Sequence, residues 1–176
     1  MNIPNKLFHL SLLCIALLFT GCGDTDSRLY VVEKHDLYGY VNAKGDTVID
    51  CKYPLSYTDT IERIGFVINK KGKIECFNNK GKFLFYVFNF DNGPDYIEEG
   101  YFRILDHNGL FGFADSLGNV VIKPQYKFAY PFKGGKAEVT YKGKMVPASP
   151  NGDGYWIWAS DDWFFISPKG KKLSSK

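Results

Sequence analysis

The sequence predicts an all-β protein, built as an array of β-hairpin repeats that follows an N-terminal signal helix. One four-residue turn pattern recurs four times, and short strands of β-branched and aromatic residues flank each copy. The four turns are Asn42–Gly45, Asn78–Gly81, Asp115–Gly118 and Ser167–Gly170. The first three turns follow one another at intervals of 36 and 37 residues, a period typical of repeat proteins. We therefore expect no substantial helix after residue 28.

The turn pattern has a local chemical basis. Each copy begins with Asn, Asp or Ser, whose side chain can accept hydrogen bonds from the backbone of its own turn. Each copy ends with Gly, which adopts a positive φ without steric cost. Pro168 stands at the second position of its turn, where a type I turn favours proline. The pattern predicts a type I turn followed by a left-handed residue.

Strands are expected on both sides of each turn. Those before the turns are 37–41, 73–77, 110–114 and 162–166, and those after them are 47–49, 83–85, 120–122 and a stub ending at Leu173. Further glycines introduce a third strand in each copy and then a second turn, at Lys71-Gly72, Asn108-Gly109 and Lys142-Gly143. One such unit cannot bury its apolar face alone, so neighbouring copies are expected to stack and share a core.

Aromatic residues around two glycines are the expected centre of that core. Tyr38 and Tyr40 flank Gly39, and Phe111 and Phe113 flank Gly112. Large rings dominate the energetics of cores. A glycine between them permits the close approach of another backbone segment.

The third copy has an aromatic–Gly–aromatic strand, a turn, an apolar strand, then Pro124 and Tyr126, and it continues into 129–137. The first copy keeps Tyr38-Gly39-Tyr40 and Tyr53-Pro54. This unit resembles the WG repeat, also called the KWG repeat, of many bacterial proteins. The second copy departs from it with Ile74-Glu75, and the fourth keeps Trp163 but has Phe164 in place of Gly. The resemblance implies about three and a half copies over residues 29–176, with an insertion at 146–161.

The N-terminal region is expected to be a targeting segment. Residues 1–6 end in a positive charge, 7–19 are an apolar run, and Thr20-Gly21 are small, which is the layout of a secretory signal. The apolar run is shorter than the ~20 residues that a transmembrane helix needs. Residues 18–22 resemble the lipobox of bacterial lipoproteins, although Phe19 stands where Leu is usual.

The lipobox resemblance implies a signal peptide over residues 1–21 and a lipidated Cys22. Residues 22–28 would then be the lipidated cysteine and a polar tether, and the protein would be held in the cell envelope, in the outer membrane on an undetermined face. An ordinary signal peptide cleaved nearby and an uncleaved anchor are the alternatives.

The composition offers little for catalysis, metal binding or nucleic acid. The net charge is +3 and the basic residues are scattered, so no nucleic-acid stripe is expected. Cys51 and Cys76 lie in expected strands, where free buried thiols compete with a disulfide as the interpretation. No cysteine spacing for a metal is present, and no cofactor is expected. We read Asn151–Gly154 with Asp161-Asp162 as a solvated loop, since the full calcium pattern is missing.

Chemistry would have to come from very few residues. His35 and His107 are the only histidines after residue 22; His107 stands beside the expected Asn108-Gly109 turn, and His35 stands just before the first hairpin strand. The spacing of the sequence does not bring a nucleophile together with a base or with a carboxylate, so we expect no enzyme activity.

The insertion is the place where specificity is expected. It and the strand after it contain Tyr155, Trp156, Trp158 and Trp163, including every tryptophan of the chain. The segment is either a cap on the last repeat or an exposed aromatic platform, because Trp and Tyr are favoured contact residues. The 55–62 segment is expected to be a second variable loop. The leading interpretation is a non-enzymatic binding or scaffold lipoprotein for an envelope protein or other ligand. The alternative is a carbohydrate-binding accessory lipoprotein.

Overall fold

The computed structural model describes residues 26–149 and 154–174. Within these ranges the regular secondary structure consists of β-strands alone. The expected signal peptide and Cys22 lie outside the described residues. Within the described ranges no helix is long and apolar enough to cross a membrane. The predicted all-β class is confirmed.

The described part of the chain contains 18 strands, five of them only two residues long. In chain order they are β1 (Leu29–Lys34), β2 (Leu37–Val41), β3 (Thr47–Tyr53), β4 (Leu55–Ser56), β5 (Thr60–Ile61), β6 (Ile64–Ile68), β7 (Ile74–Asn78), β8 (Phe83–Val87), β9 (Asn89–Phe90), β10 (Gly93–Pro94), β11 (Tyr101–Leu105), β12 (Phe111–Asp115), β13 (Val120–Tyr126), β14 (Phe128–Ala129), β15 (Ala137–Thr140), β16 (Lys144–Pro147), β17 (Trp156–Ala159) and β18 (Trp163–Ile166).

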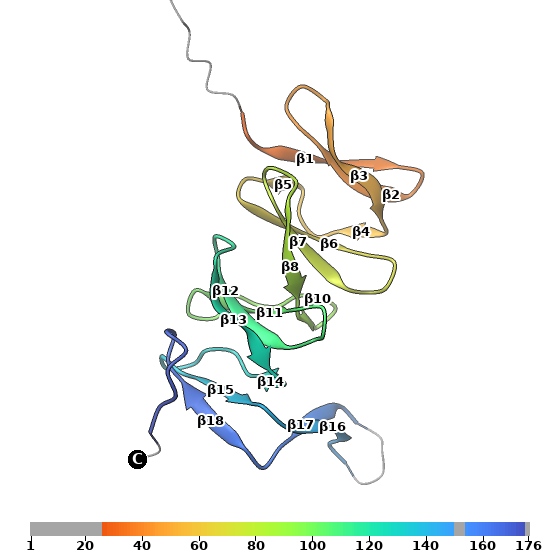
Figure 1. The fold of residues 1–176 in the computed structure, drawn as a ribbon. Coiled ribbons are helices and arrows are strands. Elements are labelled where there is room, and N and C mark those ends of the chain that lie inside the picture. Colours follow the sequence, from red (N-terminus) through yellow and green to blue (C-terminus); the bar gives the residue numbers. More distant parts are fainter. Residues whose placement is uncertain (1–25, 150–153, 175–176) are drawn as a thin grey trace, which may run out of the picture.

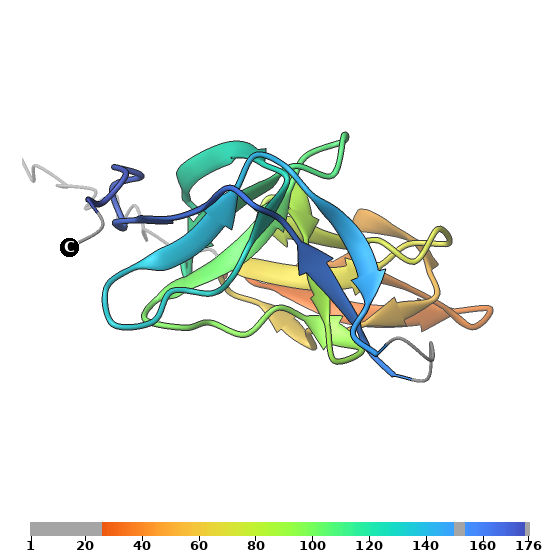
Figure 2. The same cartoon turned by 90° about the horizontal axis from the view of Figure 1, so that it is seen from below.

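The strands form four successive antiparallel units, which we call repeats 1 to 4. Repeats 1, 2 and 3 are the meanders β1–β2–β3, β6–β7–β8 and β11–β12–β13. Repeat 4 pairs β15 with β18 and ends in a single bridge between Ile166 and Lys172. Figure 1 shows the repeats arranged one after another as an elongated column. Figure 2, which looks along that column, shows that strands of successive repeats run in different directions.

The four predicted turns are formed as their side chains dictate. Asn42 Oδ1 accepts hydrogen bonds from the amides of Lys44 and Asp46, at 2.9 and 3.0 Å. Asn78 and Asp115 do the same in their own turns, and Ser167 accepts one such bond. The closing glycines all have φ between 72° and 86°. The hydrogen bonds that define these turns lie within five consecutive residues.

Gly39 and Gly112 allow the following strand to bulge. The pairing of β2 with β3 moves from Tyr40↔Ile49 to Tyr38↔Tyr53, so β3 has two extra residues opposite Gly39. A Cβ on Gly39 would lie 2.4 Å from the carbonyl oxygen of Ile49 and would collide with it. The same shift and the same 2.4 Å approach, to Ile122, occur at Gly112. The predicted close backbone approach is confirmed in both copies.

Repeat 2 lacks this bulge because it lacks the glycine. Glu75 occupies the position of Gly39 and pairs directly with Tyr86 of β8. The one irregularity of that pair lies further on, between Cys76 and Phe77. The side chains of Glu75 and Tyr86 therefore stand on the same face of the hairpin.

The connections between repeats are partly structured. Residues 55–62, expected to be a loop, contain β4 and β5, and the expectation is wrong. β4 pairs with β6 of repeat 2, and β5 pairs back with β1 of repeat 1. Ile61 in β5 is completely buried. A short segment between two sheets can form strands by pairing with both of them. Its own sequence does not indicate these partners.

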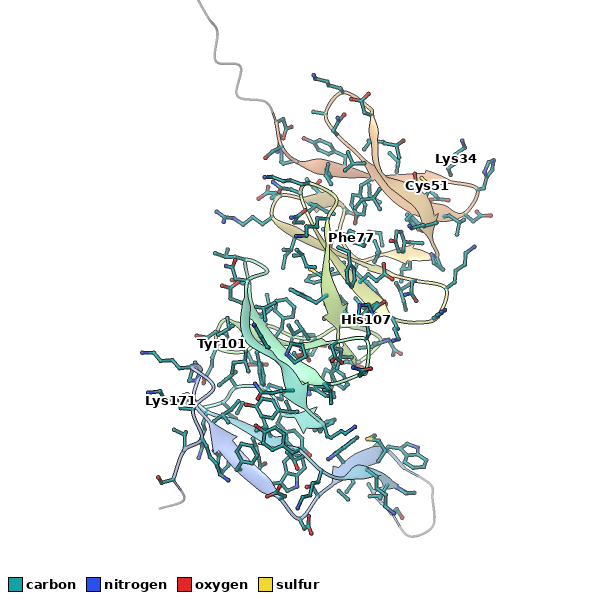
Figure 3. The ribbon with its side chains drawn as sticks, viewed as in Figure 1. Lys34, Cys51, Phe77, Tyr101, His107 and Lys171 are labelled. Carbon is teal, nitrogen blue, oxygen red and sulfur yellow. The ribbon has the colours of Figure 1, made fainter. Side chains whose placement is uncertain are left out.

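The core is divided among three clusters, each at a junction of repeats. The first combines Tyr40 and Ile49 of repeat 1 with Val67 and Phe77 of repeat 2. Figure 3 shows Phe77 between these two repeats. The second joins repeats 2 and 3, and the third joins repeats 3 and 4. Shared burial between neighbours is what the repeat prediction requires.

Three of the four predicted core aromatics are buried: Tyr40, Phe111 and Phe113. Tyr38 is only half-buried, and that expectation is wrong. The rings of Phe88 and Phe128 pack on Phe111 at 5.1 and 5.0 Å between centroids. No ring of the described residues packs on Tyr38 in this way.

Cys51 and Cys76 are free thiols in β3 and β7. Cys76 is buried, and its burial among apolar groups raises the pKa of the thiol. Cys51 is half-buried, and its Sγ lies 3.8 Å from the carbonyl oxygen of Val32. The structure supports the interpretation that these are free thiols in strands.

Candidate binding surface

The insertion of repeat 4 is a β-hairpin that projects from the end of the array. β16 and β17 pair from Lys144↔Ala159 to Pro147↔Trp156, in the connection between β15 and β18. The regular hairpin thus extends two residues before the insertion predicted at 146–161. Figure 1 shows it beside β15 and β18, at the opposite end of the column from β1.

The base of the hairpin is held by short polar contacts. The buried Thr140 and the half-buried Ser160 share a hydrogen bond of 2.8 Å between their hydroxyl oxygens. Lys142 and Asp162 form an exposed ion pair at 3.9 Å. The hydroxyls also cap the neighbouring amides of Lys142 and Asp162. The hairpin is therefore anchored where it leaves the repeat.

Tyr155 and Trp156 are the exposed part of the predicted aromatic set. The Tyr155 side chain is 76% exposed and Trp156 is 61% exposed. Met145 is also largely exposed and lies on the neighbouring strand, opposite Trp158. Trp156 and Trp158 share one face of β17, because side chains alternate along a strand. This end of the hairpin offers apolar area that the described residues do not cover.

Trp158 is fixed against the body of repeat 4. Its ring stacks on Phe128 with centroids 5.3 Å apart and an angle of 14° between the planes. Its Nε1–H donates to the carbonyl oxygen of Lys142 at 2.8 Å. A stacked ring with a satisfied N–H is rigid, so Trp158 positions the hairpin rather than offering a free face.

Trp163 belongs to the same internal cluster. It packs edge-on against Phe128, at 6.3 Å, and lies 5.3 Å from the ring of Tyr130. The structure thus separates the four predicted residues into an exposed pair, Tyr155 and Trp156, and a supporting pair, Trp158 and Trp163. Trp158 and Trp163 fit the cap interpretation, whereas contact of Tyr155 and Trp156 with a ligand stays a prediction.

Sequence analysis missed Phe128, Tyr130 and Met145, which complete this surface. Phe128 forms the centre of the cluster, and Tyr130 is exposed beside it. The signal that could have found Phe128 and Tyr130 is the aromatic pair in Phe128-Ala129-Tyr130, at β14. Their contact with the insertion spans some 30 residues of chain, and no local pattern reports it.

Tyr126 and Tyr141 form a neighbouring aromatic group with Phe164. The two tyrosine rings lie 5.2 Å apart, and Tyr141 lies 5.4 Å from Phe164. Burial, together with the nearby Tyr141, raises the pKa of Tyr126 to about 12. The phenol of Tyr126 therefore stays neutral at all ordinary pH values.

The two histidines occupy turns of different repeats. His35 lies in the β1–β2 turn of repeat 1, and His107 in the β11–β12 turn of repeat 3. Both are exposed, and His107 contacts the ring of Tyr86 at 5.4 Å. Across residues 26–149 and 154–174, no three His, Cys, Asp or Glu side chains are placed to hold a metal ion. Asn151, Gly152 and Asp153 of the considered calcium loop lie outside these ranges.

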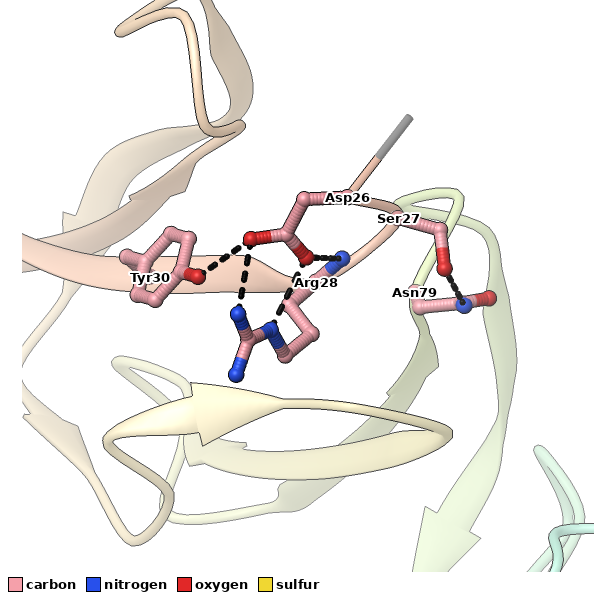
Figure 4. Close-up of polar contacts among 5 residues, drawn as sticks. All are labelled: Asp26, Ser27, Arg28, Tyr30 and Asn79. Atoms are coloured by element: carbon pink, nitrogen blue, oxygen red, sulfur yellow. Dashed lines mark hydrogen bonds and ion pairs between the residues drawn. The ribbon is translucent and has the colours of Figure 1, made fainter. Parts of the chain in front are cut away.

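The first described residues, from Asp26 onward, are hydrogen-bonded to the repeats. Asp26 accepts hydrogen bonds from Arg28 Nε at 2.8 Å and from the Tyr30 hydroxyl at 2.6 Å, as Figure 4 shows. These donors lower the pKa of the Asp26 carboxyl well below its usual range. Ser27 accepts a bond from Asn79 Nδ2 at 3.3 Å, which joins the segment to repeat 2. The expected tether is thus docked from residue 26 onward.

Residues 38–54 and 111–144 match the family model of the WG containing repeat. These two segments of the chain are therefore similar to WG repeats. The matched segments cover the hairpins around Gly39 and Gly112, the two copies whose sequences resemble the family best. No curated protein and no solved structure is similar enough to this chain to be matched. The other two WG-like units are recognised by their turns, strand order and stacking.

Proposed function

We propose that this WG-repeat protein is a non-enzymatic binding protein of the bacterial cell envelope, anchored by lipid on Cys22. The single observation that carries the binding role is the exposed aromatic end of the β16–β17 hairpin. Tyr155 and Trp156 leave most of their side-chain surface in water, which is unfavourable unless another molecule covers it. Rigid aromatic residues are favoured anchors in protein contacts.

The position of the hairpin suits a tethered protein. Residue 26 and β1 are at one end of the array and β16–β17 are at the other. Only residues 23–25 separate Cys22 from the docked segment, so a lipid on Cys22 would hold repeat 1 near the membrane. The aromatic surface would then point away from the bilayer, toward a partner.

A protein partner in the envelope is the favoured ligand. Trp156 and Met145 are exposed on the two strands of the hairpin and line none of the hollows found in the described part of the chain. Open surfaces with aromatic centres are typical of protein interfaces, whereas small ligands favour concave sites. A carbohydrate is the second candidate, because the exposed rings of Trp156 and Tyr155 offer faces on which a sugar could stack.

The binding role is tested by proximity labelling from intact cells with the full-length lipidated protein. Tyr155→Ser/Trp156→Ser removes the exposed rings and leaves the Trp158–Phe128 stack in place. Tyr96→Ser/Ile97→Ser is the matched control, since these residues are exposed elsewhere, before β11. We expect a specific envelope protein to be lost from the labelled set only with the first variant. An identical set for both variants and wild type would rule out the hairpin as the contact.

A glycan array with the same proteins separates the two ligand classes. If the wild type binds one sugar type and Tyr155→Ser/Trp156→Ser does not, the hypothesis of a carbohydrate ligand is favoured. If no glycan binds and the variant loses a labelled protein partner, the hypothesis of a protein ligand is favoured.

The anchor is tested with Cys22→Ser. We expect this variant to lose incorporation of labelled fatty acid and to leave the membrane fraction, because each buried methylene of an acyl chain contributes about 0.8 kcal/mol to membrane binding. Unchanged retention in the membrane pellet would contradict the proposed lipidation. Aromatic-surface binding could still hold in that case, so the two parts of the proposal fail independently.

A further inference from the structure

We propose that a hollow between repeats 1 and 2 binds a small polyanion carrying phosphate or carboxylate groups. The hollow has a volume of about 640 Å³ and is separate from the aromatic hairpin. Its walls come from the end of β3, the β6–β7 turn, β8 and the β11–β12 turn. Its size lies within the range of small-molecule sites, about 300–1,000 Å³.

Four lysines surround the hollow: Lys52, Lys70, Lys71 and Lys73. They face a single carboxylate, Glu75, so the lining carries a clear positive excess. No lysine of this group forms an ion pair within 4 Å among the described residues. Like charges gathered around a concave surface raise the local potential and attract an anion.

Both carboxylate oxygens of Glu75 already accept hydrogen bonds from neutral groups. Its Oε1 accepts from Asn69 Nδ2 at 2.7 Å, and its Oε2 accepts from the Tyr53 hydroxyl at 3.1 Å. Both oxygens are therefore fixed at the wall, and neither is drawn into pairing with a lysine. The ammonium groups remain available to a ligand from solution.

Aromatic rings hold part of this charge in place. Lys52 Nζ lies 5.5 Å from the ring centre of Tyr53, and Lys73 Nζ lies 4.8 Å from that of Tyr86. Tyr86 also contacts His107, which the β11–β12 turn brings to the hollow. Cation–π contacts restrict the flexible lysine chains, which lowers the entropic cost of binding an anion.

The hollow exists because repeat 2 departs from the WG pattern. Where repeats 1 and 3 have Gly39 and Gly112 beneath a bulge, repeat 2 has Glu75 paired directly with Tyr86. Regular pairing puts both side chains on one face, beside the lysines of the β6–β7 turn. The site is thus a property of this chain and not of the repeat as such.

The test is a calorimetric titration of the full-length protein in detergent at low salt. Tripolyphosphate probes the phosphate class and tri-galacturonate the carboxylate class. We expect saturable binding of at least one probe, which Lys70→Ala/Lys71→Ala weakens about tenfold or more. Raising the salt concentration should weaken binding further.

Two more variants decide whether the hollow itself is responsible. Glu75→Gln removes the one opposing charge and should tighten binding. Lys169→Ala/Lys171→Ala removes two exposed lysines from the turn of repeat 4 and should leave affinity unchanged. The proposal is overturned if neither probe saturates, or if the control pair weakens binding as much as Lys70→Ala/Lys71→Ala. Circular dichroism of each variant verifies that the strands are retained.

Discussion

At the scale of single residues, Gly112 shows how one missing side chain shapes a repeat. The carbonyl oxygen of Ile122 and the nitrogen of Pro124 would lie 2.4 and 2.6 Å from a Cβ at this position. Both are backbone atoms, which cannot rotate away. The bulge of β13 is therefore compatible only with glycine on β12.

Gly112→Ala should destabilise the protein by about 1–3 kcal/mol, the usual cost of overpacking. Ser116→Ala in the adjacent exposed turn is the control and should change stability by no more than about 0.5 kcal/mol. Urea unfolding followed by tryptophan fluorescence measures both. An unchanged midpoint for Gly112→Ala would mean that the bulge moves aside freely.

Tyr126 gives the fold a sensitivity to alkaline pH. Its folded pKa of about 12 lies above the value of about 10 in an unfolded chain. The stabilising effect of the neutral phenol is complete below pH 10 and is lost as the pH rises from 10 through 12. The unfolding free energy should therefore fall across this window.

Tyr126→Phe should make that fall less steep, by at most about 1.4 kcal/mol per pH unit for one proton. A residual slope should persist, because burial also raises the pKa of Tyr40 and Tyr53. Urea unfolding at several pH values between 9 and 12 measures the slopes. Parallel curves for wild type and variant throughout would contradict the assignment to Tyr126.

At the scale of elements, a buried ion pair fixes the segment between β10 and β11. Asp95 and Arg103 are only 6% and 3% exposed. One Asp95 oxygen accepts from the backbone amide and Nε of Arg103 at 2.8 and 2.9 Å, and the other accepts from Nη2. The guanidinium also lies over Phe88, at 4.4 Å, and donates to the carbonyl of Ala129 at 3.3 Å. One side chain thus connects the link before repeat 3 with the link after it.

Arg103→Met should cost about 3–5 kcal/mol, because it leaves the Asp95 carboxylate buried without its cation. Arg28→Met is the matched control, since its pair with Asp26 lies at the surface, and it should leave the urea midpoint almost unchanged. If the two variants unfolded at the same urea concentration, the buried pair would have no special structural role. Adding salt should not rescue Arg103→Met, because buried charges are little screened.

At the scale of the whole molecule, stability is distributed over three junctions. Each core cluster draws residues from two adjacent repeats, and the first and last repeats share none. In an array of this kind, stability is a sum of local and nearest-neighbour contributions. A defect at one end should therefore be felt mainly at that end.

Ile49→Ala tests this at the junction of repeats 1 and 2, where the side chain is buried. We expect a local loss of about 2–5 kcal/mol. Hydrogen exchange should accelerate in β1–β3 and leave β15 and β18 almost unchanged. Equal acceleration in all four repeats would show one cooperative unit instead.

The turns, the succession of strands and the requirement for glycine between aromatics can be derived from local patterns of residues. Turns such as Asn42–Gly45 close through hydrogen bonds within five consecutive residues, so they can be recognised from the local sequence. The repeat period and the all-β class follow from them. The N-terminal anchor was also predicted from sequence alone and stays a prediction.

The packing of the repeats against one another determines which aromatic side chains are exposed and which charges come together. The separation of Trp156 from Trp158, the buried Arg103–Asp95 pair and the lysine-lined hollow join residues from different strands and turns. Their positions depend on how one repeat stacks on the next. Stacking is set by burial summed over many side chains, and burial of this kind leaves no short sequence pattern.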